Sequence, residues 1–242
     1  GGARGIAHIG VIKALEEAGI KPDFISGTSA GAMIAAFYAA GYSTDEMEKI
    51  VSQSNIFHFR DFAWSKAGLL KSRTNEKMIG NYFKKRSFDL LKIPVFISAV
   101  DIVKGEVVVF SSGNIVKSLL ASFAIPVLFE PVRYKNKTLI DGSAASCFPV
   151  EPLIGKCDHI IGVYVNPVRK TNRKLNMNTI FERGFHLALY NEVRLKKKYC
   201  DVYIEPPDLN DYSMFDFKKS KKLVDIGYNY ARRFKKQLIN LS

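Results

Sequence analysis

A glycine-flanked serine constrains the fold of this chain more than any other feature. Residues 27–31 read Gly-Thr-Ser-Ala-Gly, with Ser29 at the centre of a Gly-X-Ser-X-Gly pattern. The short run 23–26 before it predicts a buried strand, and the alanine-rich run 32–40 predicts a helix that ends at Gly41. A serine at a sharp turn from strand to helix is typical of a nucleophile elbow, in which the helix dipole faces developing negative charge. For this motif alone, a tight turn without chemistry is the alternative.

The length and the alternation of elements bound the architecture. The 242 residues are enough for one sizeable α/β domain, and strand-like and helix-like stretches alternate along the chain. This pattern predicts a single domain over residues 1–242 with a mostly parallel central sheet. Three cysteines without metal-type spacing indicate a reducing compartment, so we expect a cytoplasmic protein. The sequence starts at a Gly-Gly pair, so we expect a further strand before it in the natural protein, and export stays open.

The net charge of +13 bears on partners rather than on the fold. It allows nucleic acid, anionic lipid or acidic substrates, but no nucleic-acid motif accompanies it, which argues against nucleic acid. Basic residues crowd the helices predicted within 166–242. We expect these helices to touch an anionic membrane peripherally, with a solvated basic face as the alternative.

A second glycine-rich turn opens the sequence. Residues 1–5 read Gly-Gly-Ala-Arg-Gly and lead into a helix predicted over 6–18. Such a turn leaves free N–H groups that can hold an anion, but the spacing matches neither the dinucleotide motif nor the P-loop. An oxyanion hole beside the serine elbow and a plain tight turn are both open here. We expect His8, within this helix, to pack or to face solvent rather than to act.

Asp141 is the carboxylate that the sequence singles out. It follows the apolar strand predicted over 138–140 and precedes Gly142, which places it at a strand end. A carboxylate whose pKa is raised by burial can serve as a base for a serine nucleophile. The alternative is an aspartate that caps its own turn.

Two hairpins and an aromatic segment complete the pattern. Residues 93–100 and 106–110 predict strands joined at Lys104-Gly105, and residues 132–134 and 138–140 predict strands joined at 135–137. The aromatic segment 57–64 could form a lid, an acyl-binding wall or a membrane contact, or could simply pack on the domain.

Together these motifs resemble those of the patatin-like phospholipases, specifically the compact bacterial type. Residues 1–5 resemble the family's glycine-rich oxyanion motif, residues 27–31 its nucleophile elbow, and Asp141-Gly142 its Asp-Gly motif. Residues 122–131 are similar to its Ala-Ile-Pro…Phe-X-Pro segment. The resemblance covers about residues 1–165. Position 143 is Ser where the family usually has Gly or Ala.

The resemblance implies a three-layer α/β domain, with helices flanking the sheet, that hydrolyses acyl esters of lipids through a Ser-Asp dyad. Ser29 would attack the ester carbonyl, and Asp141 would take its proton without an intervening histidine. The chemistry would need no metal and no cofactor. Arg4 would steady the glycine turn or meet a phosphate head group. The implied oxyanion hole consists of Gly1, Gly2, Ala3 and Arg4.

Alternatives to this function stay open. A Ser-Asp-His triad could combine Ser29 and Asp141 with His159 or His186, although these histidines are predicted to open a strand and to lie within a helix. The chain could instead be an inert protein that binds an anionic membrane or nucleic acid. Acyl transfer would use the same acyl-enzyme as hydrolysis. The acyl chain and head group of the substrate are likewise open.

Overall fold

The structure is a computed structural model, and it describes residues 1–53, 73–83, 86–126, 128–171 and 174–241. The aromatic segment 57–64 lies outside these residues. The strands are β1 (Ile25–Thr28), β2 (Val95–Asp101), β3 (Glu106–Phe110), β4 (Val132–Tyr134), β5 (Lys137–Asp141), β6 (Ile161–Val163) and β7 (Val202–Ile204). The helices are α1 (Ala7–Glu17), α2 (Ala30–Ala39), α3 (Thr44–Gln53), α4 (Arg73–Gly80), α5 (Ile115–Ser122), α6 (Met177–Lys196), α7 (Ser220–Ala231) and α8 (Lys235–Ile239).

β2 is the central strand of a five-stranded sheet. One of its edges pairs with β3. The opposite edge pairs first with β1, through residues 95–98, and then with β5, through residues 99–101. β1 and β5 therefore follow each other end to end along the same edge of β2, and β4 pairs with β5 at the margin.

The α/β class with helices flanking a central sheet is confirmed, and the sheet is mixed rather than mostly parallel. Among the described strands, β1–β2 and β6–β7 are parallel, whereas β2–β3, β2–β5 and β4–β5 are antiparallel. The reason lies in the two predicted hairpins, which are confirmed, because a short turn returns the chain antiparallel to itself. Lys135 and Asn136 both have positive φ, 49° and 57°, as a two-residue type I′ turn requires.

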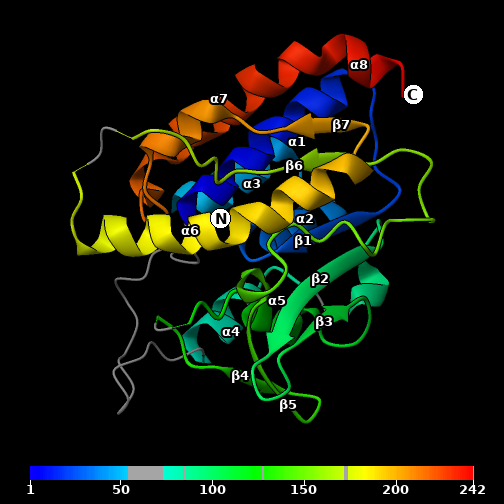
Figure 1. The fold of residues 1–242 in the computed structure, drawn as a ribbon. Helices are drawn as coiled ribbons and strands as arrows, with labels where there is room; N and C mark the ends of the chain where they lie inside the picture. Colours follow the sequence, from blue (N-terminus) through cyan, green and yellow to red (C-terminus); the bar gives the residue numbers. More distant parts are fainter. Residues whose placement is uncertain (54–72, 84–85, 127, 172–173, 242) are drawn as a thin grey trace.

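The C-terminal part of the chain packs against its beginning. α1 and α7 lie side by side in Figure 1, and two glycines let their backbones touch. A Cβ on Gly10 would lie 2.0 Å from the Val224 carbonyl oxygen, and a Cβ on Gly227 would lie 2.1 Å from that of Ala7. The last helical segment is divided into α7 and α8 by a 3-10 turn at Arg232–Phe234.

The main hydrophobic core lies between the sheet and helices α1, α2 and α5. α2 is buried along almost its whole length, because alanine allows close approach of its neighbours. Its fully buried Met33 and Phe37 pack with Ile97 of β2 and Leu119 of α5. This packing fixes the first turn of α2, directly after Ser29, against the sheet.

Candidate active site

Ser29 occupies the sharp turn between β1 and α2, as the sequence predicts. Its backbone has φ 56° and ψ −129°, a region that non-glycine residues rarely adopt and that costs about 1–3 kcal/mol. The residue is 3% exposed. Its backbone N–H donates to Ser122 Oγ at 2.9 Å, and the preceding Thr28 hydroxyl donates to the Ser146 carbonyl oxygen at 2.9 Å. Hydrogen bonds to two distant segments, at Ser122 and Ser146, therefore hold the strained serine turn in place.

The two glycines of the elbow differ in the space around them. A Cβ on Gly27 would lie 2.8 Å from the Ala32 nitrogen, so only glycine fits there. A Cβ on Gly31 would have its nearest neighbour, a His8 ring atom, at 3.7 Å, which is ordinary contact. Gly5 of the first glycine turn is crowded too, because its Cβ would lie 2.4 Å from Ala30 Cβ. The glycine turn at residues 1–5 therefore packs directly on the residue after Ser29.

Asp141 ends β5 and is 1% exposed. Its Oδ1 accepts hydrogen bonds from the Ser143 N–H at 2.8 Å and from the Ser143 hydroxyl at 2.7 Å. Burial raises the pKa of Asp141, and the Ser143 hydrogen bonds and the nearby Ser29 hydroxyl oppose that rise. Its Oδ2 is buried and has no hydrogen-bond partner of ordinary geometry among the described residues. Oδ2 is thus the acceptor left over for Ser29.

The sheet register brings Ser29 and Asp141 together. Thr28, the last residue of β1, pairs with Ser98 of β2, and Asp141 pairs with the next residue, Ala99. β1 is parallel to β2 and β5 is antiparallel to it, so their C-terminal ends meet at this point. Ser29 follows directly from one end, and Asp141 is the other end. A Cβ on Gly142 would lie 2.3 Å from the Ser98 carbonyl oxygen, so glycine is required for this junction.

The glycine turn lies beside this pair, but not all of its predicted donors are free. Residues Gly2–Ile6 form a buried 3-10 helix, in which Gly2 has a φ of 51°. The Ala3 N–H donates to the Met214 carbonyl oxygen at 2.8 Å. In this structure the Ala3 amide therefore anchors the C-terminal segment, and the oxyanion hole of Gly1, Gly2, Ala3 and Arg4 stays a prediction.

Arg4, predicted within the oxyanion hole, turns its side chain into the protein and is 3% exposed. Its Nη2 donates to Glu182 Oε1 of α6 at 2.5 Å, its Nε donates to the Tyr212 carbonyl oxygen at 2.8 Å, and its Nη1 lies 3.3 Å from His186 Nδ1. Of the two predicted roles, steadying the loop agrees with this geometry. Contact of Arg4 with a phosphate head group does not agree with the geometry, because the Arg4 guanidinium is buried against the Glu182 carboxylate.

The contacts of four residues that build this site were missed by sequence reasoning. Ser122 lies within the recognised 122–131 segment, yet its contact with the Ser29 amide depends on how α5 packs. Ser143 was visible as a departure from the family motif. Glu182 and His186 lie four residues apart and thus share one face of α6. That spacing was the available signal for a buried polar face.

The candidate triad histidines lie elsewhere. His159 Nδ1 is 3.6 Å from Asp201 Oδ1, and His186 faces Arg4. His8 hydrogen-bonds the Gly5 carbonyl oxygen at 2.8 Å, and burial lowers its pKa to about 4. Asp141 Oδ1 accepts its hydrogen bonds from Ser143, and each of these histidines has its described contact elsewhere, so the described residues assemble no Ser-Asp-His relay.

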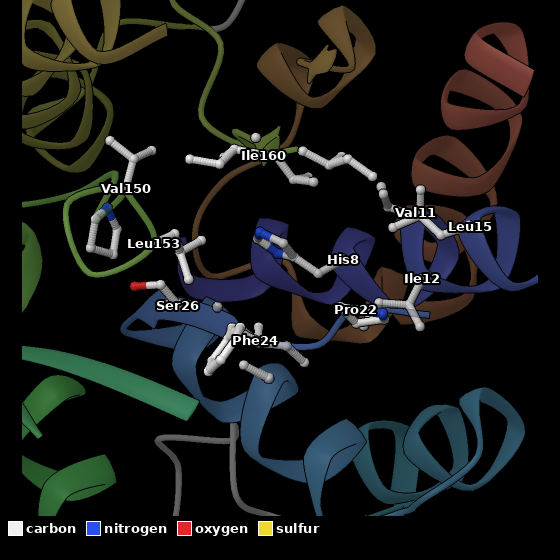
Figure 2. A pocket seen from close by; sticks show the side chains of 18 of the residues that line it. His8, Val11, Ile12, Leu15, Pro22, Phe24, Ser26, Val150, Leu153 and Ile160 are labelled. Atoms are coloured by element: carbon white, nitrogen blue, oxygen red, sulfur yellow. The ribbon is translucent and has the colours of Figure 1, made fainter. Parts of the chain in front are cut away.

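A cavity of about 950 Å³ lies next to the elbow, but neither Ser29 nor Asp141 lines it. Its lining includes His8 and neighbouring residues of α1, one side of β1 and the segment around β6 (Figure 2). Among the described strands, β1 pairs only with β2 and β6 only with β7, so each has a free edge. Unpaired strand edges of this kind accept further extended backbone.

The model of the patatin-like phospholipase family matches residues 1–154. A lysophospholipase, NTE1 of Kluyveromyces lactis, is 27% identical over 274 aligned residues, which cover 98% of this chain and 19% of that protein. The chain thus spans under a fifth of the length of such relatives.

Other relatives are of more similar length. The uncharacterised protein YqhO of Bacillus subtilis is 26% identical, with 98% of this chain and 96% of that protein covered. An uncharacterised NTE family protein of Mycobacterium tuberculosis is 34% identical over 170 residues, 69% of this chain and 47% of that protein. The crystal structure of VipD from Legionella pneumophila has a TM-score of 0.53 at 14% identity, covering 99% of this chain and 65% of that one. VipD therefore shares the fold.

Proposed function

Because this chain belongs to the patatin-like phospholipase family, we propose that it hydrolyses acyl esters of lipids with Ser29 as nucleophile and Asp141 as base. The observation that carries this proposal is the meeting of the two residues at Ser98 and Ala99 of β2. A buried carboxylate with a free oxygen beside a strained serine is the minimum that serine catalysis without histidine requires.

The proposed reaction has two steps. Ser29 Oγ attacks the ester carbonyl and passes its proton to Asp141 Oδ2; Asp141 then protonates the leaving alcohol, and an acyl-Ser29 ester is formed. Water attacks that ester, again giving its proton to Asp141, and the fatty acid leaves as Ser29 recovers its proton. The raised pKa of Asp141 supports this role, because a more basic carboxylate is a better proton acceptor.

The negative charge on the carbonyl oxygen needs donors that are already in place. We assign the Gly2 N–H and the first-turn amides of α2 to this role, since the Ala3 and Ser29 amides are engaged elsewhere. The N-terminal end of the α2 dipole also points at the serine. The Arg4–Glu182 pair keeps the glycine turn in position from behind.

For the substrate, we propose a lysophospholipid as the first candidate, because the yeast relatives are named lysophospholipases. Those relatives are much longer than this chain, so the substrate of this chain has to be measured. Phospholipids with two acyl chains and neutral lipids are the comparison substrates.

Covalent labelling with a fluorophosphonate probe, followed by peptide mapping, tests the proposal. We expect the label on Ser29, its loss in Ser29→Ala, and strongly slowed labelling in Asp141→Asn. Ser118→Ala is the matched control, because it removes another buried serine hydroxyl, one that donates to the Asn114 carbonyl oxygen at 3.0 Å. A folded chain that takes no label, or labels at the same rate in Asp141→Asn, would refute the dyad.

A further inference from the structure

The outer face of α6 carries large apolar side chains that project into solvent. Met177, Ile180, Leu187 and Leu195 are 85%, 59%, 53% and 71% exposed. Their positions fall on one helix face at three- and four-residue steps, with the exposed Gly184 and the exposed polar Asn191 at the steps between them. Figure 1 shows α6 running along the outside of the molecule. Four large exposed apolar side chains on one helix face mark a candidate interaction surface.

The opposite face of α6 is sufficient to hold the helix in place. Glu182 pairs with Arg4 and accepts a hydrogen bond from the Ser213 hydroxyl at 3.0 Å. Val193, further along the same face, is 1% exposed and packs in a small apolar cluster with Phe148. The outer stripe is therefore not needed to anchor α6, and its apolar character calls for a separate cause.

The exposed charged residues at the C-terminal end of α6 and in the turn after it are basic. Arg194, Lys197 and Lys198 are exposed at its C-terminal end. The two acidic residues of α6 are turned away from the stripe: Glu182 binds Arg4, and Glu192 binds Lys196 and the Cys147 N–H. An apolar helix face with lysine and arginine at its end, and with the acidic residues of its own helix paired elsewhere, is complementary to an anionic lipid surface.

The basic helices α7 and α8 lack this combination. Leu223 and Val224 of α7 and Leu238 of α8 are buried, and the exposed large apolar side chain there is Ile239. α7 and α8 therefore offer positive charge to a membrane, but little apolar surface that could insert into it. No helix among the described residues is both long enough and apolar enough to cross a bilayer, so a lipid contact through α6 would be made from one side.

We propose that α6 lies flat in the head-group region of an anionic membrane, with Met177, Ile180, Leu187 and Leu195 inserted and the basic residues at its C-terminal end against lipid head groups. The glycine turn contacts the inner side of α6 through Arg4, so the site would lie about one helix diameter, roughly 10 Å, from the surface. The purpose of this membrane contact rests on the proposed lipid hydrolase activity. The binding itself requires no catalysis.

Vesicle flotation tests the surface directly. The whole chain, carrying Ser29→Ala so that no lipid is consumed, is mixed with phosphatidylcholine vesicles with or without phosphatidylglycerol. We expect binding that needs phosphatidylglycerol and weakens with salt. Ile180→Gln with Leu187→Gln should lower the binding constant by about tenfold or more. Leu90→Gln with Ile154→Gln, two similarly exposed apolar residues elsewhere, should leave it unchanged.

A second pair of variants separates α6 from the other basic helices. Arg194→Gln, Lys197→Gln and Lys198→Gln together should lower binding to anionic vesicles by about a hundredfold. The matched triple variant on α7 and α8 is Lys221→Gln, Lys222→Gln and Lys236→Gln, which should lower binding far less. Equal losses in the two triple variants, or no loss in the Ile180–Leu187 variant, would overturn the proposal.

Two further outcomes are informative. If the chain sediments as a dimer that Ile180→Gln with Leu187→Gln dissociates, the stripe is an interface between copies and the membrane proposal is wrong. Hydrolysis of a soluble short-chain ester by the active chain should be unaffected by the α6 variants. A chain that binds vesicles but hydrolyses no ester would refute the proposed function and leave this inference standing, and the reverse result would do the opposite.

Discussion

Replacing Ser143 by alanine should shift the pH dependence of catalysis. The Ser143 hydroxyl donates to Asp141 Oδ1 at 2.7 Å, while its backbone N–H donates to the same oxygen at 2.8 Å. Ser143→Ala removes the first bond and keeps the second. Both bonds favour the carboxylate over the carboxylic acid and lower the pKa of Asp141, against the larger effect of burial.

The size of the shift follows from the bond that is lost. A hydrogen bond to a charged group is worth about 1.5–3 kcal/mol. At about 1.4 kcal/mol per pKa unit, its loss should raise the pKa of Asp141 by about one to two units. The sign is upward, because the charged form loses the stabilisation. Asp141 then becomes an ionised base only at higher pH, so the acidic limb of kcat/KM should move to higher pH by the same amount.

The assay is kcat/KM for a soluble short-chain ester, measured across the pH range for the wild-type chain and the variant. Activity should fall most at low pH and recover towards the wild-type value at high pH. Ser143→Thr keeps a hydroxyl and should restore the wild-type limb, and Ser118→Ala should not move it. If the acidic limb of the kcat/KM profile stays in place or moves to lower pH in Ser143→Ala, the reasoning is refuted. A uniform loss at every pH would mean that Ser143 serves only the fold.

Three further predictions concern stability. Asp141→Asn should raise Tm more at pH 8 than at pH 4. Burial raises the pKa of Asp141 in the folded state above its unfolded value, so its ionisation destabilises the fold as pH rises above about 4. Equal changes in Tm at the two pH values would contradict this. Glu182→Gln should lower the unfolding free energy by about 3–5 kcal/mol in denaturant titration and slow probe labelling, since it leaves the Arg4 guanidinium buried beside a neutral amide. Gly27→Ala should abolish the fold or the labelling, whereas Gly31→Ala should change Tm little, because their added Cβ atoms would meet neighbours at 2.8 Å and 3.7 Å.

A surface ion pair provides the control for Glu182. Glu76 Oε1 lies 3.1 Å from Arg86 Nη1, and both side chains are partly exposed. Glu76→Gln should therefore cost no more than about 1 kcal/mol. If the two substitutions cost the same, burial is not what makes the Arg4–Glu182 pair important.

The elbow and its base could be predicted from the sequence because both depend on neighbours in the chain. Gly27 is required by contact with Ala32, five residues away, and the position of Asp141 at a strand end follows from the apolar run before it and the glycine after it. The hairpin at Lys135 and Asn136 is equally local. The mixed character of the sheet could have followed from the two hairpins, since each adds an antiparallel pair.

The partners across the chain could not be predicted in this way. The Ala3 amide bonds Met214, the Arg4 guanidinium bonds Glu182, and the Ser29 amide bonds Ser122, all across long stretches of sequence. No periodicity or motif encodes which side chain packing will bring to a given backbone group. The exposed stripe of α6 could not be predicted from the sequence either, because apolar residues at helical spacing predict a buried face until the surroundings are known.

By itself, then, the sequence determined the strained serine, the carboxylate at a strand end, the glycine turn and the α/β class, because turn chemistry and side-chain periodicity act over a few residues. Only the tertiary structure decided that β1 and β5 meet end to end on β2, that the Ala3 amide bonds Met214, and which face of α6 is left uncovered. Those outcomes depend on packing between distant segments, where burial selects the partner and the local sequence does not.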